Sequence, residues 1–113
     1  MKFKLLIALI LTTQTMFAQD ALTSEDILVM NDSIQLPGTL TYHSDVESQP
    51  LVIFVHGSGN VDRNGNQGMM AKANYIKMLS DSLVSKGIAF FRFDKRTATQ
   101  SNIKFIMSNM TFE

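Results

Sequence analysis

The sequence predicts an α/β fold in which an antiparallel hairpin precedes a parallel β-α-β unit. Three observations predict it: two apolar segments rich in β-branched and aromatic residues, an amphipathic segment between them, and turn residues at their ends. The chain has 113 residues, of which 45% are hydrophobic and 18% charged. This composition is typical of a single globular domain and excludes a disordered or low-complexity chain.

The first 19 residues are predicted to be a secretory signal peptide. A basic start with Lys2 and Lys4 is followed by the apolar core Leu5–Leu11 and then by small and polar residues up to Ala18 and Gln19. The apolar core is much shorter than the ~20 residues that a transmembrane helix needs, so we expect no permanent membrane span. We therefore expect export to the periplasm or the medium, with residues 20–113 as the mature domain.

Charge and composition narrow the classes of partner and cofactor. Ten basic residues balance ten acidic ones, and no basic cluster marks a nucleic-acid surface. The absence of cysteine excludes disulfides and thiolate-bound metals, and two isolated histidines, His43 and His56, are a poor basis for a metal site. We predict no metal, no cofactor and no nucleic-acid partner, and we expect His43 at the surface.

The hairpin is predicted from alternating apolar and polar residues between turn residues. Ile27–Met30 and Gly38–Tyr42 are the expected strands, with turn chemistry at residues 31–33 and at Pro37-Gly38. The polar segment Ser44–Pro50 is expected to be a surface loop that leads into the next strand.

The parallel unit is predicted from Leu51–Val55, a helix at about Met70–Lys86 and a second strand at Ile88–Phe93. The loop Gly57–Gly68 between the first strand and the helix is long and glycine-rich, which favours a functional role. Because parallel strands share their carboxyl edge, the loops after Val55 and after Phe93 are expected to meet there. The helix is expected to bury a stripe that includes Met70, Ile76, Leu79 and Leu83.

Three segments in this order resemble a known family. They are Leu51-Val52-Ile53-Phe54-Val55-His56-Gly57-Ser58-Gly59, Asp62-Arg63-Asn64-Gly65 and Gly87-Ile88-Ala89-Phe90-Phe91-Arg92-Phe93-Asp94-Lys95-Arg96. Across residues 36–96 the chain resembles the N-terminal part of an exported α/β-hydrolase, in the branch of serine aminopeptidases and dienelactone hydrolase-like esterases. The resemblance implies an incomplete hydrolase sheet in which the strand Leu51–Val55 is central. Ile88–Phe93 would lie on one side of it and a strand after the nucleophile elbow on the other.

The resemblance also implies an oxyanion hole in the glycine-rich loop. Its donor would be the backbone N–H of Ser58, with Gly59 next and Gly57 completing the turn. No glycine of the chain frames a serine as GxSxG, so the nucleophile, the acid and the base are expected beyond Glu113. The Ser58 hydroxyl could itself be a nucleophile only with a histidine base and an acid, and neither is placed by the sequence.

Several polar residues are predicted to shape the loops at this edge. The ring of His56 is expected to bond to neighbouring loop backbone, in preference to an acid–base role. Asp62, Arg63, Asp94 and Arg96 lie on the two loops, which makes ion pairs such as Arg63 with Asp94 reasonable. The alternative is that they are solvated surface charges worth ~0 to 1 kcal/mol.

Two functional hypotheses follow. The first is the N-terminal fragment of a serine hydrolase that cleaves esters or amides through an acyl-enzyme, with a small-molecule substrate in the full-length enzyme and no activity in this chain alone. The second is a small exported, non-catalytic binding protein that keeps the hydrolase-like front sheet. A GxSxG motif in the reading frame past Glu113 would support the first hypothesis.

Overall fold

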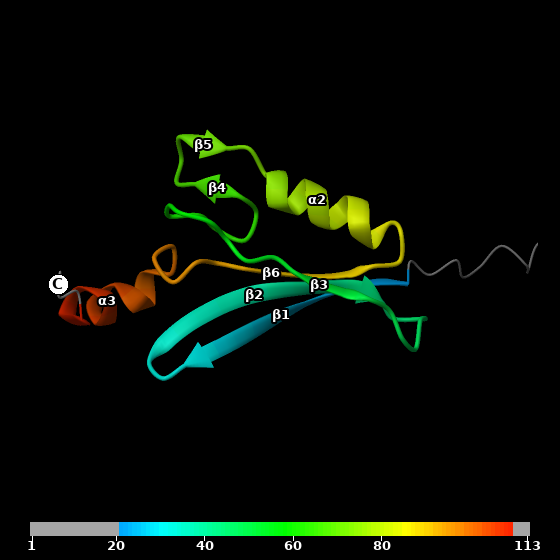
Figure 1. Ribbon diagram of the computed structural model, residues 1–113, viewed down its shortest axis with the longest axis horizontal. Coiled ribbons are helices and arrows are strands. Elements are labelled where there is room, and N and C mark those ends of the chain that lie inside the picture. Colours follow the sequence, from blue (N-terminus) through cyan, green and yellow to red (C-terminus); the bar gives the residue numbers. More distant parts are fainter. Residues whose placement is uncertain (1–20, 110–113) are drawn as a thin grey trace, which may run out of the picture.

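A computed structural model describes residues 21–109 of the chain (Figure 1). Its main sheet is mixed, with the strand order β1-β2-β6-β3, and the strands are β1 (Leu22–Asn31), β2 (Ile34–His43), β3 (Leu51–Ile53) and β6 (Ala89–Phe93). β1 pairs with β2 and β2 with β6 in antiparallel fashion, whereas β3 pairs with β6 in parallel. The chain is thus an α/β-like domain with a hairpin and a parallel pair. The predicted signal peptide lies outside the described residues.

The hairpin is longer than the sequence suggested, and one of the two predicted turns is wrong. The chain reverses at Asp32 and Ser33, where Asp32 adopts a left-handed φ of 52°. Pro37 and Gly38 instead lie inside β2. Gly38 is needed there because a Cβ at this position would lie 2.6 Å from the ring of Phe91 on the neighbouring strand.

The helix between the parallel strands is α2 (Tyr75–Val84), so the predicted start at Met70 is wrong. A small hairpin of β4 (Asn66–Gln67) and β5 (Ala71–Lys72) takes up the first part of that segment. Asn74 has a left-handed φ of 51°, which a continuing helix cannot contain. The carbonyl of Asn64 accepts the N–H groups of Ile76 and Lys77 at 3.2 and 3.3 Å, which fixes where the helix begins.

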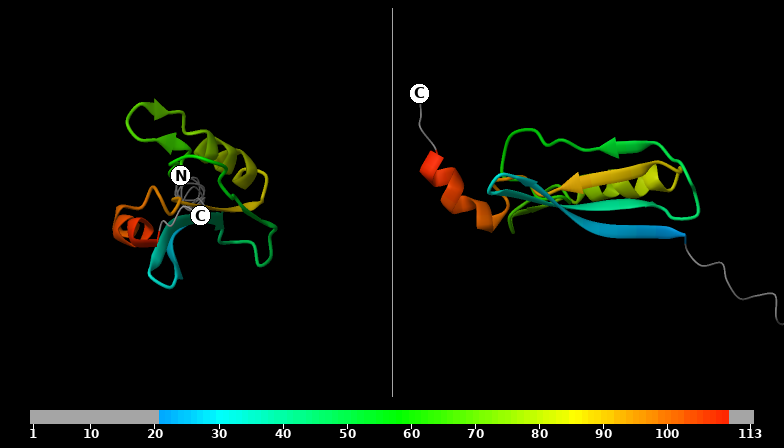
Figure 2. Two further views of the ribbon diagram at one scale, coloured as in Figure 1. Left: turned by 60° about the vertical axis from the view of Figure 1, so that its left-hand side comes forward. Right: turned by 90° about the horizontal axis from the view of Figure 1, so that it is seen from below.

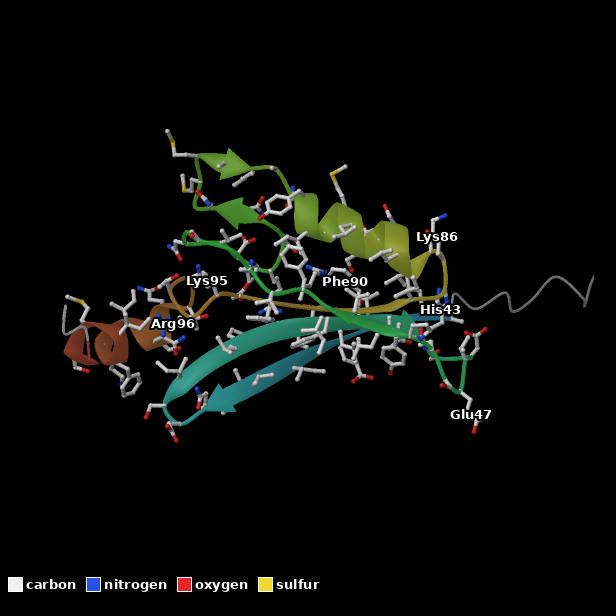
Figure 3. The ribbon with its side chains drawn as sticks, in the orientation of Figure 1. His43, Glu47, Lys86, Phe90, Lys95 and Arg96 are labelled. Atoms are coloured by element: carbon white, nitrogen blue, oxygen red, sulfur yellow. The ribbon has the colours of Figure 1, made fainter. Side chains whose placement is uncertain are left out.

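The core lies between α2 and one face of the sheet (Figure 3). Phe90 of β6 is fully buried against Ile76 and Val84 of α2, and Val61 of the long loop completes the cluster. The buried face of the helix repeats every four residues, at Ile76, Ser80 and Val84. Met70 and Leu79 of the predicted stripe are instead 99% and 41% exposed, because Met70 lies before the helix and Leu79 lies beside its buried face.

The opposite face of the sheet carries no helix among the described residues (Figure 2, right). Side chains alternate along β6, so Phe90 points to α2 while Phe91 and Phe93 stack on the other face. On this face Leu51 and Ile53 of β3 are 53% and 56% exposed. The outer edge of β3 has no strand partner within residues 21–109, so the strand that the resemblance expects there is not among them.

Two further features complete the fold. His43, expected at the surface, is half-buried, and its Nε2 bonds to the carbonyl of Val84 at 2.8 Å, which ties the end of β2 to the end of α2. After β6 the chain forms the 3-10 helix η2 (Gln100–Asn102) and the helix α3 (Ile103–Asn109). Of the helices in the described part of the chain, none has both the length and the apolar character that a membrane crossing requires.

Candidate functional site

The loops that follow β3 and β6 lie at one edge of the sheet, as the sequence predicted. β3 and β6 run parallel, and the N–H of Phe54 extends their pairing by bonding to the carbonyl of Phe91 at 3.0 Å. The first loop follows Ile53 and includes His56 and Gly57, and the second begins with Asp94. The carboxyl edge of parallel strands is where open α/β sheets place their binding sites.

The predicted oxyanion loop exposes its backbone donors. Gly57, Ser58 and Gly59 are exposed, and none of their N–H groups has a hydrogen-bond acceptor among the described residues. Gly59 has a φ of +101°, a conformation that residues with a side chain rarely adopt, so another residue would be strained there. The three residues therefore form an exposed turn whose amides are free to bind an anion or a developing oxyanion.

His56 holds this turn against the neighbouring strand. Its Nε2 carries the hydrogen and donates it to the carbonyl of Phe93, since a carbonyl can only accept. The ring meets Phe54 and Phe93 edge-on, with centroid distances of 5.6 and 5.4 Å. Its Nδ1 is buried with no partner in the part of the chain described. The ring was predicted to bond to loop backbone. It does bond to backbone, but the acceptor is Phe93, the last residue of strand β6.

Lys95 is a second tie between the two loops, and the sequence did not single it out. Its Nζ donates to the carbonyl of Gly57 at 2.6 Å, and its backbone N–H donates to the carbonyl of Val61 at 3.2 Å. Lys95 therefore bonds to the first residue of the glycine-rich turn and to Val61, two residues beyond its end. The charged run Asp94-Lys95-Arg96 was the only signal available in the sequence, and it does not say which carbonyl the lysine reaches.

Arg63 and Asp94 form the ion pair that the sequence suggested. Nη2 of Arg63 lies 2.9 Å from Oδ2 of Asp94, and Nε lies 3.2 Å from Oδ1, so the pairing is bidentate. The backbone N–H of Arg63 also donates to Oδ1 at 2.8 Å, and Nη1 reaches Thr39 and Asp26 at 2.8 and 3.1 Å. The side-chain hydrogen bonds that Arg63 donates to Asp94 are the main cause that raises the pKa of Arg63 and keeps it charged. Both side chains are about one-fifth exposed, so this is more than a solvated surface contact.

Asp62 and a set of asparagines fold the rest of the long loop. Oδ1 of Asp62 accepts the N–H groups of Asn64 and Asn66 at 2.8 and 2.9 Å, which closes a tight turn. The side chain of Asn66 in turn donates to Oδ1 of Asn74 and accepts the backbone N–H of Asn74. Arg92 of β6, 8% exposed, donates to Oδ1 of Asn64, and burial lowers the pKa of this arginine. The sequence predicted Asp62 as a loop-shaping residue, but it did not indicate the contacts of Asn64, Asn66 and Asn74.

Asn102 anchors the second loop and was missed by the sequence reading. It is fully buried, and its Oδ1 accepts the N–H of Gln35 at 2.8 Å. Its Nδ2 donates to the carbonyls of Gln35 and Arg96 at 2.7 and 3.0 Å. This one side chain therefore holds η2 and the end of the second loop on β2. Nothing in the linear sequence distinguishes it from an ordinary surface asparagine.

A hollow of about 230 Å³ lies beside these two loops. Arg96, one of the predicted loop-shaping residues, lines the hollow with an exposed side chain. Its contact with the loop is made by its carbonyl, which accepts a hydrogen bond from Nδ2 of Asn102. The hollow is bounded by Leu36, Val55, His56, Phe93, Lys95 and Arg96. No group of three histidine, aspartate or glutamate side chains that could bind a metal occurs among the residues that the structure describes.

The Arg63 pairing leads to a stability prediction. Arg63→Met is expected to lower the free energy of unfolding by about 1.5 to 3 kcal/mol, because it removes charge-assisted bonds and leaves the partly buried Asp94 carboxylate without its counterion. Lys77→Met is the matched control. It breaks a pair with Asp81 whose side chains are 49% and 58% exposed, so a loss below about 0.5 kcal/mol is expected. Urea unfolding measures both, and equal losses would contradict the prediction.

Comparison of the chain with models of protein families, with curated proteins and with solved structures finds no match.

Proposed function

We propose that this chain is the N-terminal part of an exported serine hydrolase that cleaves ester or amide bonds, and that it supplies half of the oxyanion hole. The observation that carries the proposal is the exposed turn at Gly57–Gly59, whose amide groups have no acceptor among the described residues. Such donors stabilise the negative charge that develops on a carbonyl oxygen during acyl transfer.

The surroundings of the turn support this role. A catalytic donor must be held in place before the reaction, since reorganisation during the reaction would cost part of the stabilisation. His56 bonds the turn to Phe93, and Lys95 bonds it to the end of β6 through the carbonyl of Gly57. Lys95 contacts the peptide group that carries the Ser58 N–H, and His56 fixes the residue before it, so two contacts to the end of β6 hold this donor in place.

The outer edge of β3, which has no strand partner within residues 21–109, supports the same proposal. In the proposed enzyme a further strand would pair there and would end in the nucleophile elbow. The elbow would add a second donor and the serine, and later segments would add the acid and the histidine. The hydroxyl of Ser58 has no catalytic part in this scheme.

The decisive experiment extends the reading frame past Glu113 and assays its product. We expect a GxSxG motif within the following segment and hydrolysis of p-nitrophenyl acetate that is lost when the serine of that motif is replaced by alanine. The present 113 residues alone are expected to be inactive. A stop codon directly after Glu113 would contradict the proposal and would favour the alternative, a small exported binding protein without catalytic activity.

A further inference from the structure

We propose that the hollow beside the oxyanion turn binds the anionic group of a small ligand that also carries a short apolar chain. The inference rests on the proposed function in one respect, which is that the ligand is part of the substrate. It names the class of substrate as an ester or amide with a carboxylate or a phosphate group near the reacting bond. The binding site itself follows from charge and shape.

The walls of the hollow are apolar and its rim is cationic. Leu36, Val55 and Phe93 supply the apolar surface, and these residues lie on the sheet face opposite α2. Lys95 and Arg96 are the charged residues of the rim, and no acidic residue lines the hollow. In Figure 3 both cations lie at the same end of β6. This combination suits an amphipathic anion rather than a neutral or cationic molecule.

The positive charge of this rim is not neutralised within the described part of the chain. Neither Lys95 nor Arg96 forms an ion pair there. The nearest acidic residue in sequence, Asp94, is already bound by Arg63 through a bidentate contact and a backbone N–H. Neither the guanidinium of Arg96 nor the ammonium group of Lys95 has a carboxylate partner within residues 21–109. Together they attract a carboxylate or a phosphate group.

The hollow is connected to the oxyanion turn by shared residues. His56 lines the hollow and precedes Gly57, and Lys95 both lines the hollow and bonds to the carbonyl of Gly57. A ligand whose anionic group lies at Arg96 would therefore extend its chain along Val55 and Phe93, next to the turn. Arg96 would orient the substrate by its anionic group, and the oxyanion turn would stabilise its reacting carbonyl.

Binding to the full 113-residue chain tests the inference by two-dimensional amide NMR. The probes are hexanoate, hexyl phosphate and the neutral hexanamide. Shifts are expected at residues 55–59 and 93–97, with hexanamide binding at least about tenfold more weakly than the better anion. Stronger binding of hexanoate identifies a carboxylate as the preferred group, whereas stronger binding of hexyl phosphate identifies a phosphate.

Variants of the rim separate charge from structure. Arg96→Gln is expected to weaken anion binding about five- to tenfold, and Arg96→Lys is expected to keep most of it. The control Lys72→Gln removes an exposed charge on β5, outside the hollow, and is expected to leave the affinity unchanged. Equal binding of hexanoate and hexanamide, an unchanged affinity in Arg96→Gln, or shifts confined to other parts of the sheet would overturn the inference. A failure here would leave the hydrolase proposal standing, because that proposal is tested by the GxSxG serine.

Discussion

Ser58→Pro is expected to lower kcat by about 10²- to 10³-fold in the enzyme that contains this chain, whereas Ser58→Ala is expected to retain most of the activity. The backbone N–H is the proposed oxyanion donor, so proline removes it while alanine keeps it. Among the described residues other than glycine, only Asp32 and Asn74 have a positive φ, so Ser58 already lies in the half of φ space that proline requires. The measurement is steady-state hydrolysis of p-nitrophenyl acetate.

A second proline in the same loop provides the control. Asn60→Pro places the same ring two residues further on, at an exposed position that has no proposed part in the oxyanion hole. It is expected to retain most of kcat, which separates loss of one donor from general distortion of the loop. If Ser58→Ala is as damaging as Ser58→Pro, the hydroxyl rather than the amide is essential and the assigned role of Ser58 is wrong.

Phe90→Ala is expected to lower the free energy of unfolding by about 3 to 5 kcal/mol, the largest stability effect that this fold suggests. Phe90 has no exposed surface, and it lies at the centre of the cluster that joins α2 to the sheet. Its replacement leaves a cavity between the helix and β6, which the surrounding side chains can fill only in part. The loss is measured as the shift of the urea midpoint at constant slope.

Two comparisons make this result specific to packing. Phe90→Leu keeps part of the volume and is expected to cost less than Phe90→Ala. Leu28→Ala alters a side chain that is 54% exposed on β1 and is expected to change stability by less than about 0.5 kcal/mol. A loss below about 1 kcal/mol for Phe90→Ala would show that the helix does not pack on β6 as described.

Local patterns determined the hairpin and the parallel pair but not the start of the helix. The strands were predictable because a short apolar run between turn residues has few structures open to it other than a strand. Residues 70–74 carried helical spacing, yet they form β5 and a left-handed residue. The reason is tertiary: the carbonyl of Asn64, held in the asparagine-rich turn, accepts the first helical N–H groups and sets the start at Tyr75.

The same division applies to the candidate site. The sequence by itself determined that the residues after Val55 and after Phe93 would meet, and that Arg63 could pair with Asp94. The sequence also predicted a backbone contact for His56, but only the tertiary structure decided that its acceptor is Phe93 and that Lys95 and Asn102 hold these loops, because each of the three bonds to backbone that is distant in sequence. A side-chain contact to a remote carbonyl depends on where the folded chain brings that carbonyl, and residue type and spacing carry no record of it.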